Sequence, residues 1–78
     1  MRVAYYASLR EVTGRSEEDI RLPDASTVEA LLGVVGGIHE PLRGVGRILV
    51  AVNGEFADPD TRLREGDVVA LFPPVSGG

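Results

Sequence analysis

The residues with the most distinctive chemistry are the last six, Pro73 to Gly78, and the reactive group among them is the carboxylate of Gly78. A free C-terminal carboxylate has a pKa of about 3.5, so it is ionised at neutral pH and is a poor electrophile. Because Gly77 and Gly78 have no side chains, a narrow channel in a partner can admit them, and a nucleophile can approach the terminal carbon. Chemistry at this end of the chain therefore requires prior activation of the carboxylate.

The rest of the sequence offers no set of residues for catalysis. There is no cysteine, which excludes a disulfide framework, a thiolate metal site and a catalytic thiol. His39 is the single histidine, has no nucleophile to activate, and is expected to be structural or solvent-exposed. The glycines between Gly33 and Gly46 follow a helical pattern and miss the spacing of a dinucleotide-binding loop. We therefore expect no bound cofactor and no metal site.

Composition restricts the class of partner. The 78 residues form one small domain with 12 acidic and 8 basic side chains, a net charge of −4, which argues against nucleic acid. This charge suits a partner with a basic groove or serves solubility alone. The apolar start, Met1 to Leu9, is too short for a signal peptide or a membrane span. We expect a cytoplasmic protein that does not bind membranes.

Two apolar segments, Arg2 to Ala7 and Val68 to Phe72, are predicted to form central strands that are buried on both faces. Pro73 and Pro74 end the second strand, because proline donates no hydrogen bond to a sheet. The predicted organisation is a folded domain over residues 1–74 and a flexible tail over residues 75–78.

The segments between these strands carry helix and strand signals. Ser8 is predicted to cap a short helix that stops at Gly14. The segment Ser16–Leu22 is predicted to be a strand, with its acidic run at residues 17–19 along a solvated edge. Ser26 to Glu29 reads as a capping box that opens the main helix, which is expected to end at Gly36-Gly37.

Arg47–Asn53 is predicted to be another strand, followed by a tight primed turn at Asn53-Gly54 and a return strand over residues 55–57. Leu49 and Ala51 fall on the face opposite Val50 and make it more apolar than a free surface needs, so we expect a protein contact there. The order of elements predicts an α+β fold, a β-grasp (ubiquitin-like) roll. Its first and last strands would be parallel neighbours at the centre of a mixed sheet crossed by one main helix.

The segment Phe72-Pro73-Pro74-Val75-Ser76-Gly77-Gly78 resembles the end of the small subunit of molybdopterin synthase, a family of ubiquitin-like sulfur carriers. The resemblance covers the whole chain and includes the aromatic first strand, Arg10-Glu11, Thr27 to Leu31, Val52-Asn53-Gly54 and Glu65 to Val68. The family's main helix is usually longer and more charged than this one.

This resemblance implies a function. An activating enzyme would use ATP to adenylate Gly78, and a sulfur donor would convert the adenylate into a thiocarboxylate. The large subunit of molybdopterin synthase would then receive the chain's end and transfer the sulfur to a cyclic pyranopterin. In this interpretation the chain is not catalytic alone. Gly77 and Gly78 carry the chemistry, and the partner-binding residues are Phe72, Pro73, Pro74, Val75 and Ser76.

Other functions are compatible with the same residues. A related carrier would supply sulfur for thiamine or for tRNA thiolation, or would act as a protein modifier. The segment Ser8 to Gly14 is usually absent from the shorter thiamine carriers. A β-grasp binding module without chemistry at its end is a different class, which removal of Gly77 and Gly78 would distinguish. The absence of cysteine excludes the iron–sulfur version of the fold.

Overall fold

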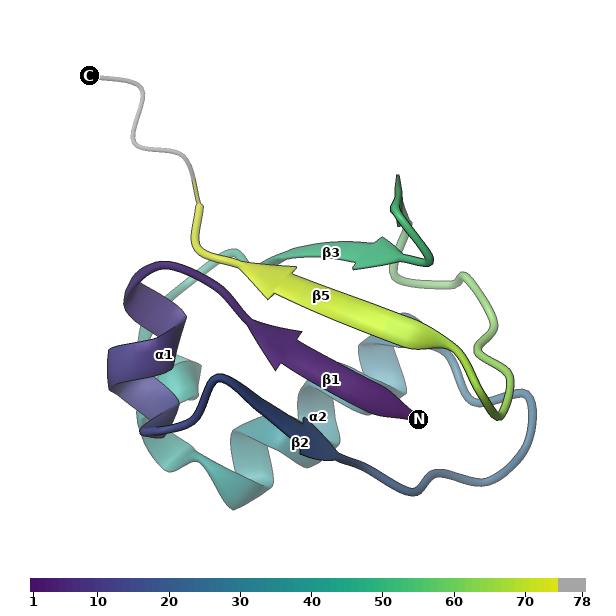
Figure 1. The fold of residues 1–78 in the computed structure, drawn as a ribbon, viewed down its shortest axis with the longest axis horizontal. Helices are drawn as coiled ribbons and strands as arrows, with labels where there is room; N and C mark the ends of the chain where they lie inside the picture. The colour runs from purple at the N-terminus through teal and green to yellow at the C-terminus, as the bar shows by residue number, and fades with distance from the viewer. Residues whose placement is uncertain (75–78) are drawn as a thin grey trace.

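The computed structural model describes residues 1–74, which form one mixed sheet with helices packed against one of its faces (Figure 1). The elements, in chain order, are β1 (Arg2–Tyr5), α1 (Ser8–Thr13), β2 (Glu17–Asp19), α2 (Val28–Ile38), the 3-10 helix η1 (Glu40–Gly44), β3 (Leu49–Val52), β4 (Glu55–Phe56) and β5 (Val68–Phe72). The strand order is β2-β1-β5-β3-β4, with β1 and β5 parallel and the other pairs antiparallel. The predicted parallel centre and the single main helix are confirmed.

The prediction that the central strands are buried on both faces is wrong. Val3 and Tyr5 of β1, together with Val69 and Leu71 of β5, point into the core and are fully buried. Val68, which alternates with them, is 50% exposed. The reason is that the helices cover only the inner face of the sheet, so each strand buries every second side chain. The apolar residues on the opposite face of the sheet are therefore not accounted for by packing in the core.

Both helices begin one residue away from the predicted caps. In α2 the N-cap is Thr27, not Ser26, and its hydroxyl oxygen accepts from the Ala30 N–H at 3.2 Å. In α1 the N-cap is Ala7, which has a φ of 52° and no side-chain hydrogen bond, so Ser8 does not cap this helix. Gly14 ends α1 in the left-handed conformation, as predicted.

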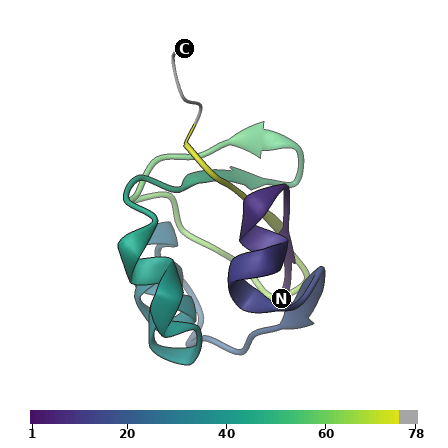
Figure 2. The same cartoon turned by 90° about the vertical axis from the view of Figure 1, so that its left-hand side faces the viewer.

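Helix α2 packs Val28, Leu31 and Val35 into the core beneath the strands. The prediction that it ends at Gly36-Gly37 is wrong. It continues to Ile38, and the N–H of its C-cap residue, His39, donates to the Val35 carbonyl at 2.8 Å. Figure 2 shows that the end of β5 points away from α2.

The β3–β4 hairpin closes as the sequence predicts. Asn53 and Gly54 both have positive φ angles, 51° and 87°, which a type I′ turn requires. The return strand is shorter than predicted and ends at Phe56. Leu63 is buried beneath the sheet and anchors the connection to β5. No helix within residues 1–74 is long and apolar enough to cross a membrane.

Candidate functional site

The predicted site residues fall into two groups. Phe72 is the last residue of β5, and Pro73 and Pro74 follow it, half-buried and exposed respectively. Val75, Ser76, Gly77 and Gly78 lie outside the described residues, so the tail and its chemistry stay predictions. The site can therefore be built from the point at which the chain leaves the sheet.

Phe72 is held by the aromatic residue that directly follows β1, the other central strand. Its ring stacks on Tyr6, with 4.8 Å between ring centroids and an angle of 14° between the planes. The Tyr6 N–H also donates to the Leu71 carbonyl at 3.1 Å, which continues the pairing of β1 with β5 for one residue. An offset aromatic stack of this kind contributes about 0.5–1.5 kcal/mol beyond the area it buries. Tyr6 thereby holds both the ring of Phe72 and the backbone of the residue before it.

Arg10 supports this stack from α1. Its guanidinium carbon lies 5.7 Å from the centroid of the Tyr6 ring, a cation–π distance. Its Nε donates to the Tyr5 carbonyl at 3.1 Å, so the side chain cannot swing away without losing a hydrogen bond. The short helix α1 therefore positions a cation next to the aromatic pair at the end of β5.

A third aromatic ring extends the patch across the sheet. Phe56 of β4 lies 6.3 Å from Phe72 between centroids, and its side chain is 77% exposed. Leu49 is paired with Phe72 in the β3–β5 register, and Ala51 is paired with both Ala70 and Phe56, so these side chains share one face. We call this surface the outer sheet face. Its members are Ala4, Tyr6, Leu49, Ala51, Phe56, Val68, Ala70 and Phe72.

The structure brings Leu49, Ala51 and Phe72 together, as a shared contact surface requires. Leu49 is half-buried, but Ala51 is only 7% exposed and offers little surface of its own. Most of the exposed apolar area comes from Tyr6, Phe56 and Val68. None of these three is among the predicted site residues. Tyr6 could have been predicted as a site residue, because the alternation along the first strand and its parallel pairing with β5 already place Tyr6 beside Phe72.

A polar cluster lies under the sheet, separate from the outer sheet face, where the sequence predicted a solvated acidic edge. Glu18 of β2 points inward and its side chain is only 10% exposed, so that prediction is wrong for this residue. The Tyr5 hydroxyl donates to Glu18 Oε1 at 2.5 Å, and His39 Nε2 lies 2.6 Å from the same oxygen. Arg15 Nε lies 3.7 Å from the other oxygen. His39 is thus structural and joins the end of α2 to the sheet edge.

The pKa directions follow from these contacts. Burial raises the pKa of Glu18, but hydrogen bonds from Tyr5 and His39 lower it more, and the result lies below the ordinary 4.5. Burial and the bond to Glu18 raise the pKa of the Tyr5 hydroxyl far above its ordinary 10.0. The cluster therefore holds an ionised carboxylate and a neutral phenol at neutral pH.

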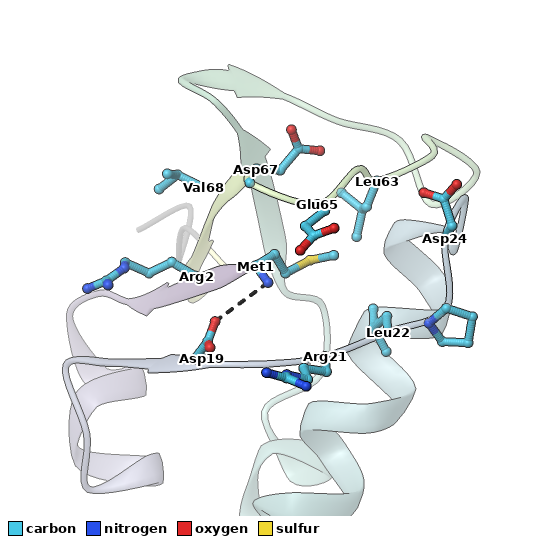
Figure 3. A pocket seen from close by; sticks show the side chains of 12 residues that line it. Met1, Arg2, Asp19, Arg21, Leu22, Asp24, Leu63, Glu65, Asp67 and Val68 are labelled. Carbon is cyan, nitrogen blue, oxygen red and sulfur yellow. Dashed lines mark ion pairs between the residues drawn. The ribbon is translucent and has the colours of Figure 1, made fainter.

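The other end of the sheet carries an open depression, far from Phe72 along β5 (Figure 3). The N-terminal amine of Met1 lies 3.5 Å from a carboxylate oxygen of Asp19, and Arg2, Arg21 and Glu65 line the same hollow. The pKa of Asp67 is lowered because its carboxylate accepts from the Arg64 N–H and the Asn53 amide. Acidic and basic side chains alternate around this hollow, so it favours neither an anionic nor a cationic ligand. Within residues 1–74 no group of three or more metal-ligating side chains is present.

Comparison with known proteins adds a family and several relatives. The sequence model described as the ThiS family matches residues 3–78. A molybdopterin synthase sulfur carrier subunit from Chlamydomonas reinhardtii is 38% identical, with 100% of this chain and 98% of that protein covered. Relatives of this name align along the full length, so the resemblance found in the sequence is confirmed.

Solved structures show the same fold. The small archaeal modifier protein 1 of Haloferax volcanii is 30% identical, with a TM-score of 0.86 and 95% of each chain covered. A chain in the complex of subunits 1 and 2 of the molybdopterin-converting factor from Helicobacter pylori is 26% identical, with a TM-score of 0.67 and coverage of 99% of this chain and 96% of that one. The predicted β-grasp roll is thereby confirmed, and one neighbour is solved with a second subunit.

Proposed function

This chain belongs to the ThiS family, and from that premise we propose that it is the sulfur-carrying small subunit of a molybdopterin synthase. The observation that carries the proposal is the similarity, over the whole chain, to proteins named molybdopterin synthase sulfur carrier subunit. These relatives are the small subunit of a two-part enzyme, and the chain is not catalytic alone. The outer sheet face supports the proposal because its residues surround Phe72, after which the chain leaves the sheet toward Gly78.

The proposed chemistry takes place at Gly78. Its carboxylate attacks the α-phosphate of ATP on an activating enzyme, which forms the acyl-adenylate and releases pyrophosphate. A sulfur donor then attacks the acyl carbon, AMP leaves, and a thiocarboxylate remains. That sulfur is a good nucleophile: on the large subunit it attacks a carbon of a cyclic pyranopterin and displaces an oxygen leaving group. Water then hydrolyses the resulting thioester, which leaves the sulfur on the pterin and restores the Gly78 carboxylate. We expect no cofactor to be bound by the chain itself, since ATP is used by the activating enzyme. Its place in the cytoplasm stays a prediction.

The large subunit is proposed to dock on the outer sheet face. Tyr6, Phe56 and Phe72 form a continuous aromatic surface, and exposed apolar patches of this kind mark protein contacts. A partner seated there would lie against the point at which Pro73 and Pro74 carry the chain out of the sheet. Neither proline has a backbone N–H, so this segment cannot add another strand residue and is free to follow a channel in the partner.

The chemistry can be tested by intact-mass measurement. The protein is incubated with an activating enzyme, ATP and a sulfur donor, and the mass should rise by the replacement of one oxygen by one sulfur, localised to Gly78. The matched control lacks Gly77 and Gly78 and should not change. If the full chain also stays unchanged, while the same enzyme modifies another carrier, the chain is a binding module without chemistry at its end.

The docking surface needs a separate experiment. Phe72→Ala and Tyr6→Ala should each weaken binding to the large subunit by about 30-fold, because truncation of a central aromatic anchor costs about 2 kcal/mol or more. Glu65→Ala, an exposed change at the other end of β5, is the control and should bind normally. If both aromatic variants bind as tightly as the unchanged protein, the outer sheet face is not the docking surface.

A protein-modifier function is the second candidate, and the similarity to a small archaeal modifier protein favours it. Both functions require activation of Gly78, and they differ in the acceptor. Transfer of sulfur to the pterin supports the first, whereas an isopeptide bond to a lysine of another protein supports the second. The chain has no lysine, since all eight basic residues are arginine, so it cannot form chains on itself through lysine side chains.

A further inference from the structure

The exposed side of α2 is unusual for a surface helix, because Glu29, in the first turn, is its only charged residue. Its members recur at helical spacing and all face solvent: Ala30, Gly33, Val34, Gly37 and Ile38. Val34 is 36% exposed and Ile38 53% exposed, so this side presents two large apolar side chains. We call these five residues the α2 outer face. A helix that is apolar on its solvent side as well as its core side normally has a second surface packed against it.

The glycines on this face have no explanation inside the described chain. A Cβ placed on Gly33 or Gly37 would meet nothing within 4 Å, and neither residue has a positive φ angle. Glycine destabilises a helix relative to alanine, so alanine would serve the isolated fold better at both positions. Two glycines one turn apart do permit the backbone of another helix to approach closely.

Opposite charges border this face on a single flank. Glu29 and Gly36 are seven residues apart, almost two helical turns, so they lie on the same side of α2. Arg43 of η1 extends over Gly36, and its Cγ is 3.5 Å from where a Cβ of that glycine would be. Within residues 1–74, neither Glu29 nor Arg43 forms an ion pair. The flank is therefore acidic at the start of α2 and basic at its end, and both charges are available to a partner.

We infer that the occupant of the α2 outer face is a second copy of this chain, packed helix to helix in an antiparallel, two-fold arrangement. A two-fold axis perpendicular to both helices keeps the same flank of each copy on one side, so Glu29 of each copy meets Arg43 of the other. A parallel two-fold arrangement would instead put this flank of the two copies on opposite sides of the contact, so that Glu29 of one copy would not meet Arg43 of the other. The antiparallel one also opposes the helix dipoles favourably.

This contact leaves the proposed synthase surface free. The α2 outer face points away from the sheet, because Val28, Leu31 and Val35 of the same helix face the core, whereas the aromatic patch lies on the other side of the sheet. The inference therefore does not depend on the proposed function. An 11-residue helix is about 16 Å long, so the contact is smaller than the roughly 1,200 Å² of a stable interface. We expect a weak dimer that forms at high concentration.

Sedimentation equilibrium of the full chain, from about 10 µM to 1 mM, tests the inference. The unchanged protein should show a reversible monomer–dimer equilibrium. Glu29→Arg and Arg43→Glu should each weaken it at least tenfold, and the double exchange should restore it. Gly33→Leu should also weaken it at least tenfold while leaving the monomer folded, since that site is open. Glu65→Arg makes the same change of charge elsewhere and should have no effect.

Two results would overturn the inference. One is a protein that remains monomeric at 1 mM, which would mean that the α2 outer face does not bind a second copy. The other is a dimer that neither Gly33→Leu nor the single charge reversals weaken, which would place the contact on another surface. Circular dichroism of each variant establishes that a lost dimer is not a lost fold.

Discussion

Replacing Glu18 by alanine should lower the free energy of unfolding by about 2–4 kcal/mol. The Tyr5 hydroxyl and His39 Nε2 both bond to one carboxylate oxygen of Glu18, and the Tyr5 residue is fully buried. Each buried polar group that loses its partner costs about 1–3 kcal/mol, and water entering the vacated space reduces the sum. For 78 residues a total stability of about 4–12 kcal/mol is typical, so this variant should lose a large part of it.

Glu17→Ala is the matched control. Glu17 is the preceding residue of the same strand, but it points to solvent and pairs with Arg2, and both side chains are at least half exposed. Exposed pairs contribute about 0.2–1 kcal/mol. Urea denaturation followed by circular dichroism gives both values from the midpoint and slope. If Glu18→Ala loses no more stability than Glu17→Ala, the buried cluster does not hold β2 to the core.

The Glu18 carboxylate also predicts a pH dependence of stability, whose sign follows from its pKa. The pKa of Glu18 is lower in the folded chain than its ordinary 4.5, so the folded state favours the ionised form. The stability contributed by ionisation is fully present above the unfolded-state pKa and is lost as the pH falls through the lower, folded-state value. The difference between the unchanged protein and Glu18→Gln should therefore be constant near neutral pH and should shrink below about pH 4.5. An equal difference at pH 7 and pH 3 would contradict this assignment.

Three further changes test local features, each by urea denaturation. Thr27→Ala should cost about 1 kcal/mol because α2 loses its cap, whereas Ser26→Ala should cost less. If Ser26→Ala cost more than Thr27→Ala, Ser26 would be the cap, as the sequence predicted. Gly33→Ala should stabilise the monomer by about 0.5–1 kcal/mol, since the new methyl meets nothing within 4 Å. Gly54→Ala should destabilise it by about 1–2 kcal/mol because φ is +87° there, and a gain in stability would show that the turn can change type.

The outline of the fold was predictable because local signals and the hydrophobic pattern agreed. Apolar runs at both ends of the chain indicated neighbouring central strands, and Asn53-Gly54 specified its turn through backbone sterics alone. The errors arose where two local signals competed. Ser26 and Thr27 can both cap a helix, and only the three-dimensional path of the chain gives this role to Thr27. Helix α2 likewise continues past Gly36 and Gly37 to Ile38, and the N–H of His39 bonds to the Val35 carbonyl, although glycine is a common signal of a helix end.

The buried carboxylate shows what a single sequence does not reveal. Glu17, Glu18 and Asp19 look alike as a charged run, but the alternation of β2 points only Glu18 inward. Its partners are Tyr5, 13 residues away, and His39, 21 residues away, and no local pattern connects them. The sequence predicted Phe72 and Leu49 as site residues, and the register places them side by side, but it did not predict the stack between Tyr6 and Phe72.

The register between β1 and β5 links the stability of the fold to the proposed function. In this register Leu71 is buried while Phe72, one residue later, lies on the outer sheet face against Tyr6. A shift of one residue would exchange the two sets of side chains, removing Val69 and Leu71 from the core. The energy that holds the core together therefore also determines which side of the sheet carries the aromatic surface. It determines as well where Pro73 begins. In the proposed function the partners carry out the chemistry, so the docking surface and the start of the tail must keep a fixed position relative to each other. The burial of alternate residues in β5 fixes that position.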